Sequence, residues 1–198
     1  MHTTIFTTPI VNTLLRKFSV FFLKAKGWKI EGTLPEGASK CVFIAAPHTS
    51  NWDLPYTLMV AFALRLNIYW MGKQSIFTFP FGGLMRWLGG IAVNREASSN
   101  LVSASAQALV NAEGPVQLVI PPEGTRSKTR YWKTGFYYIA LEANVPILMT
   151  YMDYHSKISG IGPMLHPTGD IEKDMAIVKA FYAPFKGKNA EQFETTNR

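Results

Sequence analysis

Hydrophobic residues in this chain of 198 residues follow two patterns: short continuous runs, and longer stretches with one apolar face. The runs at 40–46 and 116–120 are followed by proline, and such runs are typical of strands covered on both faces. We expect strands at 40–46, 67–71, 91–94, 116–120 and 146–151, and another near Ile158. We expect helices at 84–88, 98–113, 135–143 and 171–182, and another after the turn at 47–52.

Strands and helices that alternate in this way predict an α/β fold, with a mixed, mostly parallel sheet flanked by helices. The length supports a single domain with its own core. We divide the chain into an N-terminal amphipathic segment at 1–27, a main domain at 28–185 and a polar C-terminal tail at 186–198. We expect the tail to fray, because it is polar and terminal.

The segment 10–23 predicts an amphipathic helix near the start of the chain. Its apolar stripe consists of Val11, Leu14, Leu15, Phe18, Phe21 and Phe22. Basic residues lie on or beside the helix, namely Arg16, Lys17, Lys24, Lys26 and Lys29. Two interpretations stay open: the helix packs on its own domain, or it lies on the surface of an anionic membrane.

Composition excludes several classes of protein. With 47% apolar and 17% charged residues, the chain is too hydrophobic to be disordered. The net charge of +7 favours anionic partners. The single Cys41 allows no intrachain disulfide and no cysteine-based zinc site, which fits a reducing compartment. The sequence shows neither a secretory signal nor a run of the roughly 18 apolar residues that a membrane-spanning helix needs.

A candidate catalytic pair lies in PHTSNWD (47–53), where a strand is expected to turn into a helix. If His48 lies in the turn and Asp53 in the first helical turn, the carboxylate can accept one imidazole N–H and leave the other nitrogen as a general base. No protein nucleophile accompanies the pair, so the attacking oxygen would belong to the substrate. Alternatively, His48 only makes a hydrogen bond near the helix cap and Asp53 only interacts with the helix dipole.

The same turn offers Thr49, Ser50 and Asn51 as helix caps. The chain has no GxSxG, HExxH, GxxxxGK[ST] or strand-associated GxGxxG motif, which weakens the case for ordinary hydrolases, zinc proteases and nucleotide-binding folds.

Two further turns carry basic residues. PPEGTRSK (121–128) follows a buried strand, and Arg126 and Lys128 could hold a phosphate there. GGIAVNR (89–95) ends a strand with Arg95, which is either a solvated strand end or a second phosphate ligand. Turns at the ends of strands of one sheet would converge on a single crevice.

These segments, together with VPILMT (145–150), resemble the four ordered motifs of the glycerolipid acyltransferases, the 1-acyl-sn-glycerol-3-phosphate acyltransferase family. Order and spacing fit from about residue 28 to residue 183. The resemblance implies that 28–185 is an acyltransferase domain. It also implies transfer of an acyl group from acyl-CoA or acyl-carrier protein, as co-substrate, to the hydroxyl of a lysophospholipid. No bound cofactor and no metal are implied.

The resemblance also assigns roles to residues. His48 would take the hydroxyl proton, Asp53 would orient His48, and Arg95 and Arg126 would hold the acceptor phosphate. Other residues expected at the substrate site are Glu123, Gly124, Thr125 and Lys73, although Lys73 could equally be a solvated charge. Phe77, Phe79, Phe81 and Trp87 are either ordinary core or the wall of an acyl groove.

Two positions depart from the family pattern: Asn94 stands where an acidic residue is usual, and Met149 where a proline is usual. The acceptor could therefore differ from that of other members. The expected partners are a lysophospholipid, an acyl thioester carried by CoA or by acyl-carrier protein, and an anionic membrane surface, but no nucleic acid. We expect a cytoplasmic protein, peripheral on the inner face of the cell membrane. The competing hypothesis is a non-catalytic lipid-binding protein with the same basic surface.

Overall fold

The computed structural model describes residues 3–93 and 100–195. Seven strands form one sheet. In chain order they are β1 (Lys29–Glu31), β2 (Lys40–Ala46), β3 (Ile68–Lys73), β4 (Gly90–Val93), β5 (Val116–Ile120), β6 (Ile147–Asp153) and β7 (Ile158–Leu165). The helices are α1 (Pro9–Ala25), α2 (Asp53–Leu64), α3 (Gly82–Trp87), α4 (Leu101–Val110), α5 (Gly135–Ala143) and α6 (Ile171–Tyr182), with short 3₁₀ helices η1 (Gln74–Phe77) and η3 (Ala190–Gln192).

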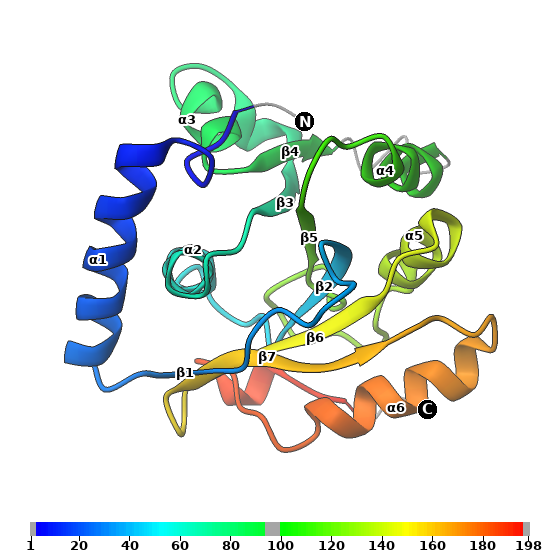
Figure 1. Ribbon diagram of the computed structural model, residues 1–198. Helices are drawn as coiled ribbons and strands as arrows, with labels where there is room; N and C mark the ends of the chain where they lie inside the picture. The colour runs from blue at the N-terminus through cyan, green and yellow to red at the C-terminus, as the bar shows by residue number, and fades with distance from the viewer. Residues whose placement is uncertain (1–2, 94–99, 196–198) are drawn as a thin grey trace.

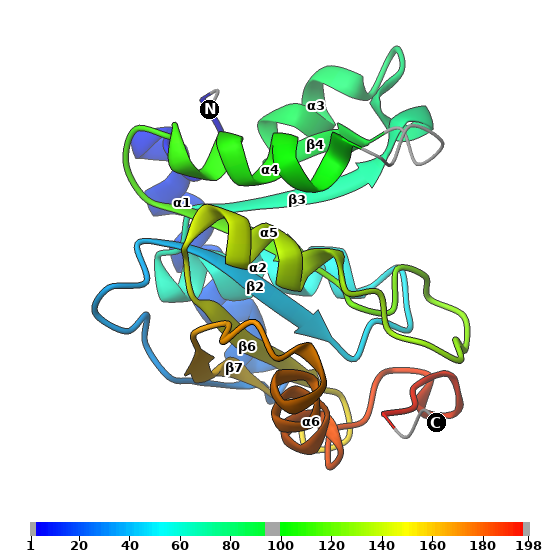
Figure 2. The same ribbon diagram turned by 90° about the vertical axis from the view of Figure 1, so that its right-hand side faces the viewer.

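Helices cover both faces of the sheet (Figures 1 and 2). One face carries α1 and α2, and the other carries α4, α5 and α6. Successive residues of a strand point to opposite faces, so Phe43 of β2 belongs to the core cluster under α2, while Ile44 belongs to the cluster under α5 and α6. The predicted α/β domain with an N-terminal helix is therefore confirmed.

The order of strands in the sheet is β1-β7-β6-β2-β5-β3-β4. All pairings are parallel except that of β6 with β7. Phe43 lies at the centre, between Val119 of β5 and Leu148 of β6. Because parallel strands end at the same edge of a sheet, the segments that follow β2, β3 and β5 meet at one edge.

The segment 186–195 packs against the turn that follows β2. The backbone N–H of Asn189 donates to Thr49 Oγ1 at 3.2 Å, and its side-chain amide donates to the Thr49 carbonyl at 2.7 Å. Lys186 N–H donates to Asp153 Oδ1 at 3.1 Å, and the ring of Phe193 lies 6.0 Å from that of Trp132. The expectation of a frayed tail is therefore wrong for residues 186–195.

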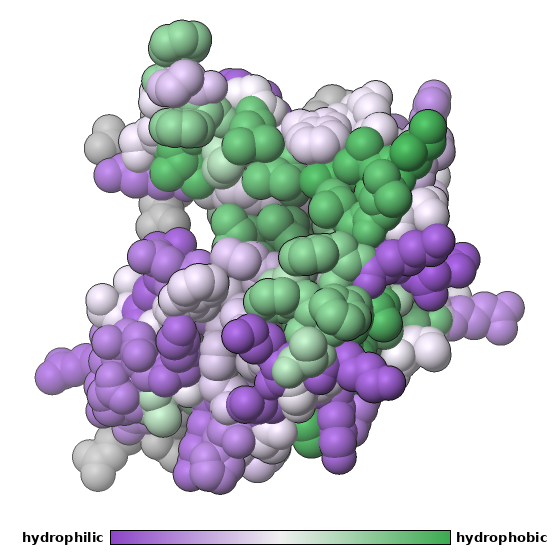
Figure 3. All heavy atoms as spheres, turned by 90° about the vertical axis from the view of Figure 1, so that its left-hand side faces the viewer, coloured by the Kyte–Doolittle hydropathy of each residue, from purple (hydrophilic) through white to green (hydrophobic). Residues whose placement is uncertain are grey.

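Helix α1 packs along α2 and buries Ser19 and Leu23. Its opposite side exposes Ile10, Leu14, Phe18 and Phe21. The helix therefore packs on its own domain and still presents an apolar stripe to solvent. Figure 3 looks at this face of the molecule, where apolar side chains gather over α1 and again in the region of η1 and α3. In the described part of the chain, no helix is both long and apolar enough to cross a membrane.

Candidate active site

The turn between β2 and α2 brings His48 and Asp53 together. His48 Nδ1 lies 3.1 Å from Asp53 Oδ2. The side chain of Asp53 is 7% exposed and that of His48 is 21% exposed, so the carboxylate is enclosed while the imidazole reaches the surface of a cleft. A carboxylate can only accept from the imidazole, which assigns the proton to Nδ1 and leaves the Nε2 lone pair available as a base.

Three further donors hold the carboxylate of Asp53. The backbone N–H groups of Thr49 and Ser50 each donate to Oδ2 at 2.9 Å. The hydroxyl of Tyr154 donates to Oδ1 at 2.9 Å. Hydrogen bonds of this kind stabilise the ionised form of a buried carboxylate, so Asp53 is built to carry a negative charge beside His48.

The helix cap differs from the sequence expectation. Trp52 occupies the N-cap of α2 without a side-chain cap, so none of Thr49, Ser50 and Asn51 plays that part. Instead the Asp53 carboxylate reaches back to the turn, where it accepts the N–H groups of Thr49 and Ser50. The turn is thus folded around the acid that supports His48.

Glu123 binds the backbone of His48. Its Oε1 accepts the backbone N–H of His48 at 2.7 Å, and its other oxygen, Oε2, is buried without a hydrogen-bond partner among the described residues. Burial raises the pKa of Glu123 to about 8; the bond from His48 lowers this pKa and the nearby charge of Asp53 raises it. Glu123 does not line the cleft. The structure therefore shows Glu123 in contact with the backbone of His48, and its role at the substrate site stays a prediction.

The cleft beside His48 has a volume of about 380 Å³. The expected site residues on its wall are His48, Asp53, Lys73, Gly124, Thr125 and Arg126. Lys73 ends β3 and Arg126 follows β5, so the two cations come from neighbouring strands and meet at one cleft. The turns after β2 and β5 thus meet at one cleft, as the sequence predicts for these two, while the end of the third turn lies outside the described residues.

Of the two other expected phosphate ligands, only Lys128 lies among the described residues, and it does not line this cleft. Lys128 pairs with Glu194 at 2.9 Å. Arg95 lies outside the described residues, as does Asn94. The described cationic wall of the cleft therefore consists of Lys73 and Arg126.

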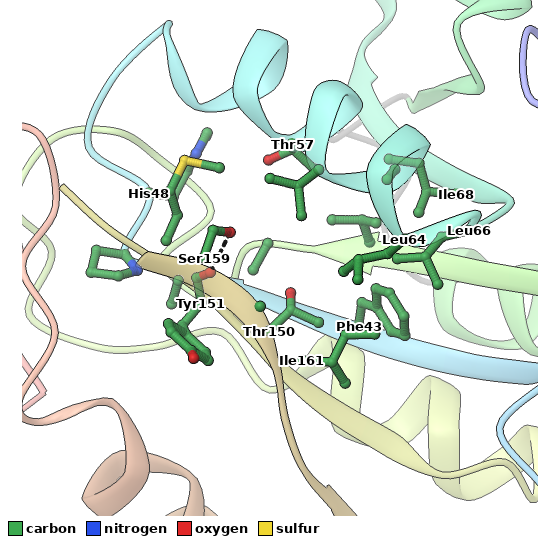
Figure 4. Close-up of a pocket in the computed structure, with 18 residues that line it drawn as sticks. Phe43, His48, Thr57, Leu64, Leu66, Ile68, Thr150, Tyr151, Ser159 and Ile161 are labelled. Carbon is green, nitrogen blue, oxygen red and sulfur yellow. Dashed lines mark hydrogen bonds between the residues drawn. The ribbon is translucent and has the colours of Figure 1, made fainter. Parts of the chain in front are cut away.

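A narrow apolar cavity of about 50 Å³ runs from His48 between α2 and the sheet (Figure 4). Phe43, Leu64, Leu66, Ile68 and Ile161 line its far part, as the figure shows. Ala45, His48, Thr57 and Val119 line both this cavity and the cleft, so the two spaces adjoin at the histidine. Met149, the other departure from the family pattern, is buried in the core on the opposite face of the sheet.

The arrangement suits proton transfer next to an anionic group. A neutral imidazole oriented by a buried carboxylate can take a proton from a hydroxyl, and two cations on the wall of the same cleft can neutralise a phosphate. No hydrogen bond joins His48 Nε2 to a protein hydroxyl or thiol within residues 3–93 and 100–195. In the same residues, no group of three or more His, Cys, Asp or Glu side chains is arranged to hold a metal ion.

Fold and site together define an α/β domain with an acid-supported histidine in a basic cleft. Comparison with known families goes further: residues 28–153 match the model of the Acyltransferase family, and the chain belongs to that family. The resemblance of the four sequence motifs is thereby confirmed.

The chain is also similar to curated and solved proteins. It is 28% identical to a 1-acyl-sn-glycerol-3-phosphate acyltransferase of Haemophilus influenzae, over 67% of this chain and 58% of that relative. It is 31% identical to the protein of the same name from Salmonella typhimurium, over 62% of this chain and 51% of the relative. The chain thus spans little more than half the length of these relatives.

Among solved structures, the fold matches the 1-acyl-sn-glycerophosphate (LPA) acyltransferase PlsC from Thermotoga maritima, with a TM-score of 0.59 and 17% identity. The match covers 94% of this chain and 81% of the solved one. At this identity the likeness establishes the fold alone.

Sequence reasoning missed Tyr154 and Asn189, which support the turn from outside the four motifs. Tyr154 directly follows β6, whose sequence includes most of the fourth motif. Its place one residue beyond a strand end, at the edge where the site forms, was the available signal. Asn189 gave no signal, because its contact with Thr49 joins residues 140 positions apart in the chain.

Proposed function

We propose that this protein transfers a fatty acyl group from a thioester, acyl-CoA or acyl-carrier protein, to the free hydroxyl of a lysophospholipid such as 1-acyl-sn-glycerol-3-phosphate. The observation that carries the proposal is the 3.1 Å contact between His48 Nδ1 and Asp53 Oδ2 in a cleft that Lys73 and Arg126 also line. Family membership and the names of the curated relatives support the reaction class.

In the proposed reaction, His48 Nε2 takes the proton of the acceptor hydroxyl as its oxygen attacks the thioester carbonyl. Asp53 fixes the tautomer of His48 and stabilises the imidazolium that forms. The tetrahedral intermediate then expels the thiolate, and the imidazolium returns the proton to it. The products are a new ester and a free thiol, so the reaction needs no resident cofactor.

The basic wall of the cleft supports a phosphorylated acceptor. Lys73 and Arg126 are exposed cations at the ends of neighbouring strands, and the planar fork of an arginine matches two phosphate oxygens. Gly124 and Thr125 lie on the same wall. We place the acceptor phosphate against Lys73 and Arg126 and its hydroxyl at His48. Arg95, which follows β4, stays a candidate third ligand from outside the described residues.

The apolar cavity behind His48 supports an acyl chain. Its walls are mainly aliphatic and aromatic, and it adjoins the cleft at the imidazole, where the carbonyl carbon would react. A cavity of about 50 Å³ is smaller than a long acyl chain, so α2 and the sheet must separate slightly for such a chain to enter fully.

We also propose that the face shown in Figure 3 lies on an anionic membrane. The aromatic segment before α3 is part of this proposal: Phe77 is core, as one interpretation expected, but Phe79 is 97% exposed and Phe81 is also exposed. Neither of these two side chains fits the expectation of core or acyl groove. Ile76 is exposed beside them and also lines the cleft, so docking of this surface would bring the cleft mouth to the lipid.

The test is to incubate the purified protein with a panel of lysolipids and with both thioester donors, and to identify the products by mass. We expect an acylated lysophospholipid and one free thiol per ester formed. His48→Ala should abolish both while the protein stays folded, and His155→Ala, an exposed histidine, should leave both unchanged. If the protein binds vesicles but turns over no thioester, it is the lipid-binding protein of the competing hypothesis.

A further inference from the structure

The carboxylate of Asp53 is held by two side chains, one on each oxygen. Oδ2 faces His48 Nδ1 at 3.1 Å, and Oδ1 accepts the hydroxyl of Tyr154 at 2.9 Å. The three side chains come from separate parts of the chain: the turn after β2, the start of α2 and the residue after β6. Two of the strands involved, β2 and β6, are neighbours in the sheet, so the sheet itself sets the distance between His48 and Tyr154.

We propose that Tyr154 is a positioning residue for the proposed acyl transfer. Its hydroxyl fixes the carboxylate of Asp53 in the orientation at which Oδ2 accepts a hydrogen bond from the Nδ1–H group of His48. The terminal torsion of an aspartate is broad, and the energy of its side chain varies little over a wide range of angles. The backbone donors of Thr49 and Ser50 both bind Oδ2, so Tyr154 alone holds the other oxygen among the described residues. This inference rests on the proposed function of the site.

The ring of Tyr154 is itself held firmly. It meets Trp28 edge-on at 5.2 Å and Tyr56 at 5.9 Å, and Trp28 and Tyr56 lie 5.0 Å apart. Leu23, from the last turns of α1, belongs to the same buried cluster. The hydroxyl that binds Asp53 is therefore anchored to α1, α2 and the end of β6 together.

Tyr154 remains a donor over the working range of pH. Burial raises its pKa well above the ordinary value for tyrosine, and the charge of Asp53 and the hydrogen bond to it raise this pKa further. The other groups that bear on the titration of the pair are Glu123 behind His48, Tyr56 on α2, and Lys73 and Arg126 across the cleft. All of them are unchanged when the hydroxyl of Tyr154 is removed.

Tyr154→Phe tests the proposal, because it keeps the ring and its packing and removes only the donor. Tyr56→Phe is the matched control: it removes a hydroxyl from the same aromatic cluster, but no hydrogen bond of Tyr56 to Asp53 is present. A hydrogen bond to a charged group is worth about 10- to 100-fold in an equilibrium constant. We expect kcat of Tyr154→Phe to fall by about 10-fold or more with little change in KM, while Tyr56→Phe stays within about twofold of the wild type.

The pH profile separates positioning from a general structural effect. Without the Tyr154 donor, the carboxylate of Asp53 is free to turn away from Nδ1, so the imidazolium loses part of its counter-charge and the acidic limb of kcat/KM should move to lower pH. The same shift should appear in an NMR titration of the His48 ring protons, which needs no turnover. An unchanged His48 titration, or an equal loss of kcat in both variants, would overturn the role of Tyr154. A titration that shifts in a protein with no acyl transfer would instead show that the proposed function has failed.

Discussion

Glu123 and His48 are joined through the 2.7 Å hydrogen bond from the His48 backbone N–H to the Glu123 carboxyl, so the loop after β5 fixes the residue that carries the imidazole. The side chain that makes this bond is almost fully buried, and within the described part of the chain only one of its oxygens has a hydrogen-bond partner. Its protonation therefore affects the stability of the fold.

The first prediction concerns this carboxyl. Its pKa is about 8 in the folded protein against 4.5 ordinarily, so between these values the folded state keeps a proton that the unfolded chain releases. The stabilisation is fully present below the lower pKa and is lost as the pH rises through the higher one. Between about pH 5 and pH 9, we expect the melting temperature of the wild type to fall more than that of Glu123→Gln. The difference should correspond to roughly 1 kcal/mol or more in the free energy of unfolding.

Thermal unfolding followed by circular dichroism measures this difference. Glutamine keeps an oxygen to accept the His48 N–H, so the comparison isolates the charge. Melting curves of the two proteins that shift in parallel with pH would show that Glu123 does not titrate in this range.

Asp53→Asn should slow acyl transfer by about 100- to 10,000-fold, the range attributed to general acid–base catalysis. The amide oxygen can take the place of Oδ2 and the NH₂ group can face the Tyr154 hydroxyl, which also accepts, so the main loss is the negative charge that stabilises the imidazolium. Steady-state kinetics on the preferred lysolipid provide the measurement. Asp170→Asn, at the cap of α6, is the control and should keep full activity; a normal rate for Asp53→Asn would reduce Asp53 to a support of the turn.

Leu64→Phe should shorten the acyl chains that the protein accepts. Leu64 lines the far part of the cavity behind His48, and each buried methylene is worth about 0.8 kcal/mol, or roughly fourfold in selectivity. Competition between thioesters of different length, read by product mass, gives the shift. Leu58→Phe makes the same change on α2 at a residue that lines neither space. Equal effects of the two variants, or no effect of Leu64→Phe, would place the acyl chain elsewhere.

Leu14→Ser with Phe21→Ser should weaken binding to anionic vesicles by about 100-fold or more. The reason is that both side chains are exposed, and burying each of them in the membrane would contribute about 1.5–3 kcal/mol to the free energy of binding. Cosedimentation at several salt concentrations checks this, since the contribution of the basic residues is screened by salt. Leu141→Ser with Ile177→Ser, exposed on α5 and α6, should bind as the wild type does. Equal binding of both double variants would remove α1 from the docking surface.

The elements that could be predicted from the sequence are those whose pattern is local. The expected bounds of β2, β5, α5 and α6 match the structure, because apolar runs, prolines and helical periodicity all lie within each element. Strand β1 was missed because it has three residues and pairs with β7, more than 120 positions later.

The candidate site divides in the same way. His48 and Asp53 are five residues apart, so one turn determines their contact, and the parallel sheet accounts for the meeting of Lys73 and Arg126. Tyr154 and Asn189 reach the turn from 101 and 140 positions away. The partner of Lys128, Glu194, is also distant in the chain. Such contacts depend on the complete fold and leave no trace in local spacing.

The bonds from Asn189 to Thr49 make the end of the described chain a structural part of the loop that carries His48. Under the proposed function, loss of this segment by proteolysis or truncation would release the turn that holds His48 and lower the rate of acyl transfer. The last ten described residues would thus influence the reaction, although none of them lines the cleft.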